Sequence, residues 1–513
     1  MPFINLNTEH IAIQKEDFDF VIVGSGVAGI LLAVKLTEKG KRVLIIESGD
    51  YAEDELHQGL NTVEQTGKEL TNAVWGRKRA IGGTTIAWGG QSLPFSKMDF
   101  EKRDWVVNSG WPIQKKDIEQ YYPLANRFMG VDELDYDAQV FKMLGMKKLP
   151  FDENLVSYHF SKWAPEPNFK NLYYDYLNAN ATVLYNAVVT NINIATAGKA
   201  ESVSVKNFNK QEYTIPVSQL LLATGTIEAN RILLASNDIV KEGLGNQSRK
   251  LGKYFMDHPC IEVGFVKTNK NYKLQSCFNT HMYRKRKYSV RISLSEIAQK
   301  NTKQLNASAG IMFDYLDNMD PYIEVRQFLQ TKSASSLVKS FKNLPAMGLS
   351  AAALLKDNLI YKHKARARTV MMLEQEPLES SYIKLSNNKD GFGMPKAVIN
   401  WDISYKTWET ATSLSSYLKK ELNRLSLGEL EIHKHINADT QNWQDYLTDV
   451  NHHMGGTRMS ETPADGVVNT DLQVWGHDNI HVCSCAVFPT VSHSNPTLTM
   501  MALCLRLVDK LTK

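Results

Sequence analysis

The chain has 513 residues, of which 43% are hydrophobic, 22% charged and 10% aromatic, so it is long enough for two or more packed domains. This composition excludes a disordered chain, a collagen and a small disulfide scaffold. The 59 Lys and Arg residues against 55 Asp and Glu residues leave a net charge of only +4, which gives no reason to expect a nucleic-acid partner.

The N-terminal part predicts a strand, a helix and a second strand. Residues 18–23 are a run of aromatic and β-branched residues, which is typical of a strand buried on both faces. Apolar residues at helical spacing follow over 30–39, and residues 43–46 predict another buried strand. This order is the βαβ unit of a parallel sheet.

The turn between the first strand and the helix has GxGxxG spacing, formed by Gly24, Gly26 and Gly29. Gly24 permits a tight turn, Gly26 lets the main chain approach a pyrophosphate, and Gly29 allows close packing of helix on strand. Glu47 ends the second strand, where an acid accepts hydrogen bonds from ribose hydroxyls. An acid there disfavours a 2′-phosphate, so the unit predicts FAD or NAD rather than NADP.

A second glycine-rich segment, residues 79–90, contains Gly82, Gly83 and Thr84 and would let backbone N–H groups approach a phosphate or an aromatic ring. Later, an apolar strand over 219–223 ends at Thr224 and Gly225. The other predicted elements are helices over 117–129, 227–235 and 407–425, and strands within 181–194 and over 261–266, 288–292, 371–376 and 397–401.

Near the C-terminus, His452 and His453 precede a pair of glycines, and Asn495, Pro496 and Thr497 open a last helix. Taken in this order, the segments resemble the glucose–methanol–choline (GMC) family of flavin oxidoreductases over nearly the whole chain. Two strands of the middle region are similar to a bacterial subgroup near the sugar and pyranose oxidases and dehydrogenases. A plain NAD dehydrogenase is disfavoured because the second and C-terminal segments would then have no purpose.

The resemblance implies one FAD, held by backbone and side chains from both ends of the chain. The C-terminal residues would lie against the flavin ring, with the last helix directing its N-terminus at the pyrimidine edge. The residues implied in cofactor binding are Gly24, Gly26, Gly29, Glu47, Gly82, Gly83, Thr84, Thr224, Gly225, Pro496 and Thr497.

Three residues depart from the family pattern. Ala87 stands where some relatives attach the flavin covalently through a histidine, so we expect non-covalent FAD. Ser484 replaces an aspartate that contacts the flavin in many relatives. His493 is an additional histidine, either structural or substrate-contacting, or an auxiliary base.

The resemblance implies that His453, three residues before Gly456, is the general base and that Asn495 donates a hydrogen bond to the developing alkoxide. A neutral imidazole suits proton abstraction near pH 7. His452 is interpreted as a neighbour pointing away, and His258 as structural. The basic run 362–368 is either a solvated face or a docking surface for an acidic partner or a membrane.

The five cysteines, an odd number, argue against a disulfide framework and for a reducing compartment. Cys483 and Cys485 are interpreted as small residues at a strand end, and no metal is expected. No secretory signal and no stretch of the ~20 apolar residues that a membrane span needs are present. We therefore expect a cytoplasmic protein without membrane contact.

We predict an α/β, two-domain fold: a Rossmann-like FAD-binding domain and a discontinuous substrate domain built on a mostly antiparallel sheet. The FAD-binding domain takes 15–100, 180–258 and 450–513, the substrate domain takes 259–449, and 101–179 forms a helical connection near the pocket.

The predicted function is FAD-dependent oxidation of an alcohol, a secondary hydroxyl of a sugar, glycoside or polyol, with O₂ or a quinone or cytochrome as acceptor. The alternatives are a lyase of the same family with a structural FAD and a catalytically silent flavin-binding protein. The substrate and the oligomeric state are left open.

Overall fold

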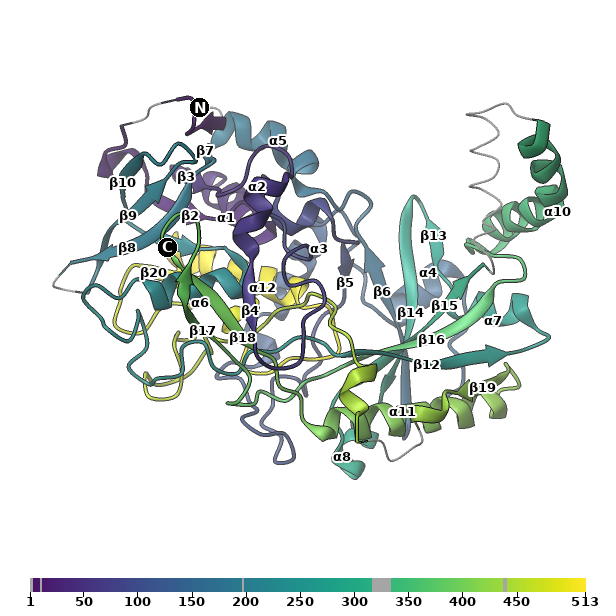
Figure 1. Ribbon diagram of the computed structural model, residues 1–513. Coiled ribbons are helices and arrows are strands. Elements are labelled where there is room, and N and C mark those ends of the chain that lie inside the picture. The colour runs from purple at the N-terminus through teal and green to yellow at the C-terminus, as the bar shows by residue number, and fades with distance from the viewer. Residues whose placement is uncertain (1–2, 10–11, 196–197, 316–333, 437–440) are drawn as a thin grey trace.

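A parallel sheet of six strands organises one side of the molecule, as the computed structural model shows (Figure 1). The structure describes residues 3–9, 12–195, 198–315, 334–436 and 441–513. In spatial order the strands are β1 (Phe3–Asn5), β7 (Thr182–Tyr185), β3 (Val43–Ile46), β2 (Phe20–Val23), β11 (Leu220–Leu222) and β20 (Ile480–Val482). The side chains of β2, β3 and β11 are buried, which confirms the predicted strands.

Helices cover this sheet because their apolar residues need burial. The helices of this side are α1 (Val27–Thr37), α3 (Tyr122–Phe128), α5 (Phe169–Asn180), α6 (Gly225–Ala235) and α12 (Thr497–Leu511). α1 packs against β2 and β3 and also contacts α5 and α12. α12 brings the C-terminal end of the chain back beside the N-terminal βαβ unit, so the two ends of the chain share one core.

An antiparallel sheet of eight strands forms the other side of the molecule (Figure 1). In spatial order these are β19 (Glu429–Ile432), β12 (Cys260–Lys267), β16 (Arg366–Leu373), β15 (Ala307–Asp314), β14 (Arg286–Leu294), β6 (Val156–Trp163) and β5 (Gln91–Ser92), with β13 (His281–Tyr283) paired to β14. Every pairing in this sheet is antiparallel. The predicted fold class is confirmed.

The helix α11 (Tyr405–Arg424) packs across one face of the antiparallel sheet, against β15, β16, β19 and β6. Its buried side chains recur at helical spacing and include Trp408, Leu414, Leu418 and Leu422. Three shorter helices lie on the same side of the molecule: α4 (Ala138–Leu144), α7 (Asn271–Phe278) and α8 (Glu296–Thr302). One face of the sheet is therefore a hydrophobic core, and the opposite face is left for polar residues.

Two small sheets complete the fold. One is antiparallel and consists of β8 (Val188–Ile194), β9 (Ala200–Lys206) and β10 (Glu212–Pro216); the other consists of β17 (Tyr382–Lys389), β18 (Pro395–Asn400) and β4 (Val63–Gln65). β4 pairs in parallel with β18, although the two strands are far apart in the sequence.

The structure differs from the predicted segments at several places. Segment 101–179, predicted as a helical connection, also supplies β6 to the antiparallel sheet and α5 to the parallel side. β1 joins the parallel sheet ahead of residue 15. These assignments depend on pairing between distant strands, which local residue patterns do not encode.

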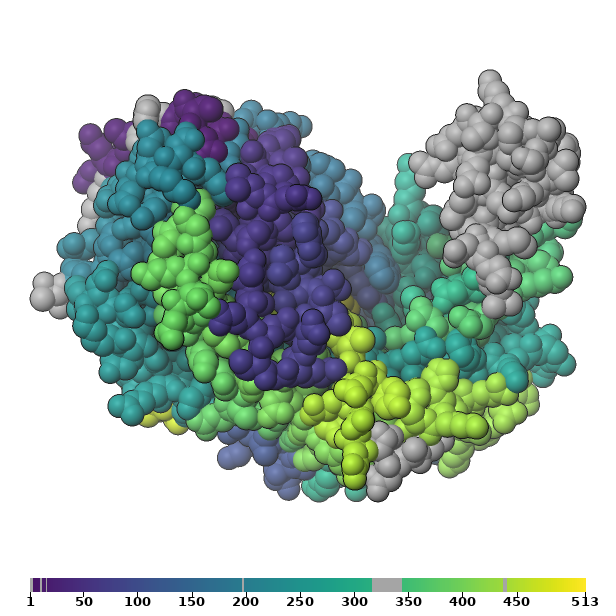
Figure 2. Space-filling view, viewed as in Figure 1, coloured from purple at the N-terminus to yellow at the C-terminus, as the bar shows by residue number. Residues whose placement is uncertain are grey.

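The helix α10 (Ala334–Asp357) lies at one corner of the molecule, where it contacts β13 (Figure 1). Figure 2 shows the body built on the parallel sheet beside the antiparallel side of the molecule. Among the helices that the structure describes, none combines the length and the apolar character needed to cross a bilayer.

Candidate functional site

The glycine-rich turn lies between β2 and α1, at the carboxyl end of the parallel strands. Gly24 has a φ of +98°, a left-handed conformation that glycine adopts without strain. A Cβ on Gly29 would lie 1.9 Å from the carbonyl oxygen of Gly24, so α1 approaches the turn only because residue 29 has no side chain. A Cβ on Gly26 would meet nothing within 4 Å. Gly26 therefore faces open space, where a ligand can approach the backbone.

The second glycine-rich segment packs directly against this turn. Gly82 precedes the short 3-10 helix η3 (Gly83–Ile86), and its N–H donates a hydrogen bond to Oγ of Ser25 at 3.2 Å. A Cβ on Gly83 would come within 2.8 Å of Cα of Gly26. The two glycine-rich segments thus form one continuous surface of backbone.

Glu47 lies at the end of β3 and is buried against the turn. Its Oε2 accepts hydrogen bonds from the N–H of Ser25 at 2.8 Å and from the Oγ of Ser25 at 2.7 Å. Its Oε1 accepts a hydrogen bond from the N–H of Gly49 at 2.8 Å. The Glu47 carboxylate therefore fixes the shape of the turn. The sequence also predicts that this carboxylate contacts the ribose of the cofactor.

A cavity of about 780 Å³ runs along these segments to the C-terminal histidines. The predicted site residues that line it are Gly24, Gly26, Glu47, Gly83, Thr84, Thr224, Gly225, His453, Asn495, Pro496 and Thr497. Gly29 and Gly82 lie behind its wall and shape the two turns. Segments from both ends and from the middle of the chain therefore meet at one cavity.

A cluster of charged side chains, which the sequence analysis did not identify, also lines this cavity. Glu228 of α6 pairs with Arg77 at 3.4 Å, with Arg79 at 2.9 Å and with Arg231 at 3.2 Å. Burial opposes ionisation of Glu228, but the three guanidinium groups outweigh it and lower its pKa to about 2. Asp390 also pairs with Arg231, so two carboxylates face three guanidinium groups, which leaves one positive charge for a phosphate-bearing ligand.

The residues of the cavity fit a flavin dinucleotide. Gly26 leaves room for a pyrophosphate, and the arginine cluster supplies positive charge. Oγ1 of Thr224, just before α6, is buried and has no hydrogen-bond partner among the described residues. Such an orphaned hydroxyl at a cavity wall indicates a partner that the protein itself does not supply.

The last helix begins at this cavity. Thr497 is the first residue of α12, Pro496 precedes it, and both line the cavity. Pro496 has a φ of −74°, which suits the entry to a helix. The positive end of the α12 dipole is therefore directed toward the part of the cavity that holds Asn495.

His452, the neighbour of the predicted base His453, lies beside Asn495. Nε2 of His452 is 3.5 Å from Nδ2 of Asn495, at the limit of a hydrogen bond, and Nδ1 of His452 is 3.0 Å from Nδ1 of His258. The main chain of His452 is fixed as well, because its N–H donates to Oδ1 of Asp257 at 3.0 Å. His258 therefore contacts the site and is not a remote structural residue.

His453 also reaches the cavity wall, but its ring faces a different group. Nε2 of His453 lies 3.7 Å from Oδ2 of Asp257, and the ring packs near Phe255 at 5.9 Å between centroids. The backbone directly after His453 is fixed, since Met454 exchanges two backbone hydrogen bonds with Met256. Both histidines line the cavity, and the contact with Asn495 is made by His452.

Burial controls the protonation of this group. Burial lowers the pKa of His452 to about 4, and burial together with Arg77 and His452 lowers that of His453 to about 3. Burial also raises the pKa of Asp257 to about 8, with Asp449 adding to the effect. Both imidazoles are therefore neutral near pH 7 and can accept a proton.

Two of the three residues that depart from the family pattern also lie at the cavity. Ala87, directly after η3, lines it and offers no nucleophile to a flavin. Ser484 lines it too, with its Oγ accepting a hydrogen bond from the N–H of Ala486. His493 lies outside the cavity lining, and its Nε2 is 3.0 Å from Oγ of Ser293 in the antiparallel sheet.

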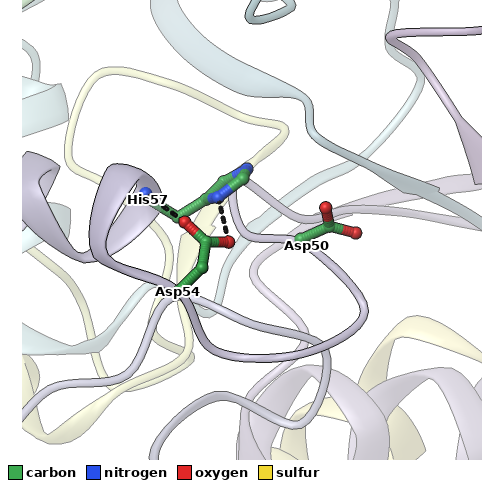
Figure 3. Close-up of side chains that lie close together, drawn as sticks. All are labelled: Asp50, Asp54 and His57. Atoms are coloured by element: carbon green, nitrogen blue, oxygen red, sulfur yellow. Dashed lines mark hydrogen bonds and ion pairs between the residues drawn. The ribbon is translucent and has the colours of Figure 1, made fainter.

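One group of potential metal ligands lies apart from this cavity, formed by Asp50, Asp54 and His57 (Figure 3). Nδ1 of His57 is 2.5 Å from Oδ2 of Asp54, and Nε2 is 2.5 Å from Oδ1 of Asn186. Asp54 caps the short helix α2 (Glu55–Gln58) by accepting from the N–H of His57. Both ring nitrogens are engaged, so the group is a helix cap joined to a neighbouring turn.

Comparisons with known proteins agree with this geometry. The family model described as GMC oxidoreductase matches residues 377–504, and one described as FAD binding domain matches residues 19–59. The chain is 23% identical to the fructose dehydrogenase large subunit of Gluconobacter japonicus, over 96% of this chain and 97% of the relative. It is 20% identical to 2-methyl-1,2-propanediol dehydrogenase of Mycolicibacterium austroafricanum, over 98% and 96%. Among solved structures, pyridoxine 4-oxidase from Mesorbium loti superposes with a TM-score of 0.58 at 15% identity, over 96% of this chain and 99% of the other.

Proposed function

The chain belongs to the GMC family of FAD-dependent oxidoreductases, and from that premise we propose that it oxidises a secondary hydroxyl of a sugar, glycoside or polyol to a carbonyl. The names of two relatives, one a fructose dehydrogenase and the other a diol dehydrogenase, support a sugar or a polyol as the substrate. The observation that carries the proposal is the meeting of His452 and Asn495 at the wall of the flavin-sized cavity.

FAD would be held by the two glycine-rich segments, Glu47 and the N-terminal end of α12. When bound, it supplies the acceptor for the hydride that leaves the carbinol carbon. We propose that it is bound non-covalently, because Ala87 has no nucleophilic atom. Acid precipitation of the yellow holoenzyme should release all of the flavin into the supernatant, whereas flavin retained in the washed pellet would contradict this proposal.

His452 is our candidate for the general base. Asn495 presents an N–H donor to Nε2 of His452, which is therefore the acceptor nitrogen. The Nδ1–H of His452 then donates to Nδ1 of His258. In this tautomer the lone pair of Nε2 faces Asn495 across a contact of 3.5 Å. A substrate hydroxyl that displaces this contact can give its proton to Nε2 as the hydride leaves.

Asn495 would stabilise the developing alkoxide. Its Nδ2 lies on the same side of the cavity as Nε2 of His452, so one substrate oxygen can contact both groups. A hydrogen bond directed at a developing charge is stronger in the transition state than in the ground state. Asn495→Ala should therefore lower the rate of flavin reduction more than it weakens substrate binding.

Asp257 is a positioning residue for the base. Its Oδ1 accepts from the N–H groups of both His258, at 2.6 Å, and His452, at 3.0 Å. These two bonds fix the segments that carry the paired imidazoles and so keep their Nδ1 atoms in contact. A rigid base is needed because a small displacement from the carbinol would slow proton transfer.

The proposed reaction is tested by mixing the oxidised holoenzyme anaerobically with sugars, glycosides, polyols and aliphatic alcohols. Bleaching of the oxidised flavin absorbance by a secondary alcohol is the expected result. Conversion of an alcohol without bleaching would contradict oxidation and would indicate a lyase with a structural flavin.

O₂, a quinone or a cytochrome can each accept the electrons of the reduced flavin and so complete the reaction. The rate at which the reduced enzyme recovers its absorbance with each acceptor distinguishes an oxidase from a dehydrogenase.

A further inference from the structure

The face of the antiparallel sheet that is turned away from the core is polar. Along β14, alternate residues from Tyr288 to Leu294 are buried in the core, while Ser289, Arg291 and Ser293 lie on the opposite face. Residues of the same face on the neighbouring strands, such as Trp163 of β6, line the cavity. This face is therefore the protein wall that a substrate above the flavin would meet.

Arg291 is held in place on this face by its neighbours. It lies opposite Gly310 of β15, where an added Cβ would come within 2.6 Å of Nη1, so glycine leaves the space that the guanidinium fills. Nη2 donates to Oε1 of Gln91 at 3.3 Å, and Nε2 of Gln91 donates to Oγ of Ser161 at 2.7 Å. Gln91 itself lines the cavity, so the guanidinium lies one hydrogen bond from its wall.

Arg291 has no carboxylate partner among the described residues, and its contact there is with the neutral Gln91. Arg368, on the same face, is different: its Nε donates to Asp314 at 3.0 Å and its Nη1 to Glu262 at 3.2 Å. Burial lowers the pKa of Arg291, and the Cys260 thiol partly offsets this effect. An arginine nevertheless stays charged near pH 7. A half-buried guanidinium without a counter-charge is costly unless a ligand supplies one.

The titratable groups around Arg291 do not supply that counter-charge. His159 and His493 both hydrogen-bond to Oγ of Ser293, at 2.5 Å and 3.0 Å. Burial lowers the pKa of each, and Arg291 lowers both further. The histidines are therefore neutral and the local potential is positive, which favours an anion.

Resting on the proposed alcohol oxidation, we propose that Arg291 is a specificity-determining residue that binds the carboxylate of the substrate, so that the preferred substrates are polyhydroxy acids of the sugar-acid class. A planar guanidinium and a carboxylate form paired, charge-assisted hydrogen bonds. The Gln91 amide, which lines the cavity, can bind a hydroxyl of such a molecule.

The test measures binding to the oxidised holoenzyme, using the perturbation of flavin absorbance, for D-gluconate and D-glucuronate against the uncharged D-sorbitol and D-glucose. The acids are expected to bind at least tenfold more tightly than their neutral counterparts. Arg291→Gln should reduce this acid-to-neutral ratio roughly 10- to 100-fold, as expected for loss of hydrogen bonds to a charged group. Arg291→Lys should retain part of the preference, and guanidinium ion added to Arg291→Ala should restore part of it.

Arg368→Gln is the matched control, because it removes an arginine that is already paired with carboxylates on the same face. An unchanged acid-to-neutral ratio in Arg291→Gln, or an equal loss in Arg368→Gln, overturns the inference. Flavin reduction by neutral alcohols without any preference for acids overturns it too and leaves the proposed oxidation standing. Arg291-dependent binding of acids without any flavin reduction supports the anion site and overturns the proposed reaction.

Discussion

At the residue scale, the two adjacent histidines contact different groups. His452 contacts Asn495 and His258, whereas Nε2 of His453 faces Asp257. The family resemblance implies that His453 is the base, and our proposal assigns that role to His452 because of its contact with Asn495.

Replacement of each histidine in turn tests this assignment. His452→Ala should slow anaerobic flavin reduction roughly 10²- to 10⁴-fold, the usual contribution of a general base. His453→Ala, the matched neighbour, should slow it less than about tenfold by the same scale. Rapid-reaction spectroscopy with one reducing alcohol measures both variants, and a larger loss in His453→Ala would restore His453 as the base.

The pH dependence of flavin reduction follows from the lowered pKa of His452. Burial lowers this pKa to about 4, so the neutral, proton-accepting form persists well below the ordinary value of about 6.5. The reduction rate should therefore be nearly constant from about pH 6 to 8 and should fall only as the pH approaches 4. A rate that already halves near pH 6.5 would contradict the low pKa.

The lowered pKa of His452 also determines how the stability of the fold changes with pH. A histidine whose pKa is lowered on folding favours the neutral state, so its stabilising contribution is complete above about pH 6.5. That contribution is lost as the pH falls from 6.5 toward 4, because the unfolded chain takes up the proton first. The denaturation midpoint should drop over this range in the wild-type protein and less steeply in His452→Asn.

At the element scale, the βαβ unit uses its glycines for two separate purposes. Gly29 lets α1 approach the turn, because a side chain there would collide with the carbonyl oxygen of Gly24. Gly26 faces the cavity, and its φ of −72° is accessible to any residue. Helix packing and ligand approach can therefore be perturbed independently.

A pair of alanine substitutions distinguishes these purposes. Gly29→Ala should lower the free energy of unfolding of the apoprotein by about 2 kcal/mol or more, as overpacking against backbone does. Gly26→Ala should change that free energy by less than about 1 kcal/mol. It should nevertheless weaken FAD binding, because the added methyl group enters the open space. Chemical denaturation and fluorescence titration with FAD measure the two effects, and equal destabilisation by both substitutions would contradict the division.

At the scale of the whole molecule, a buried ion pair joins the two bodies. Arg103 lies shortly before Trp111, which packs with Phe488 in the core of the parallel side. The guanidinium of Arg103 makes two hydrogen bonds to Glu374, the residue directly after β16. Both side chains are almost fully buried, at 1% and 0% exposure. The pair therefore ties the antiparallel sheet to the parallel one where water does not screen it.

Glu374→Gln should lower the free energy of unfolding by about 3–5 kcal/mol, since it leaves a buried guanidinium without a counter-charge. Glu133→Gln, which breaks the exposed pair with Arg127, is the control and should cost no more than about 1 kcal/mol. Urea denaturation followed by circular dichroism measures both variants. Comparable small losses would show that the buried pair does not hold the bodies together.

The sequence determined much of this protein on its own. The strand, turn and helix around Gly24 were predictable because the periodicity of apolar residues and the positions of glycine are local properties of the chain. The same holds for β3, β11, α11 and α12, and the resemblance to the family followed from the order of these segments. The C-terminal histidines and Asn495 were predicted from the sequence to lie near one another, and the structure places them at one cavity.

Only the tertiary structure decided that His452 contacts Asn495, that β6 belongs to the antiparallel sheet, and that Arg291 lies one hydrogen bond behind the cavity wall without a carboxylate partner among the described residues. Each of these depends on contacts between residues far apart in the chain. Local composition determines whether a segment forms a helix or a strand. The register between distant strands determines which side chains meet, and that register is set by the packing of the whole molecule.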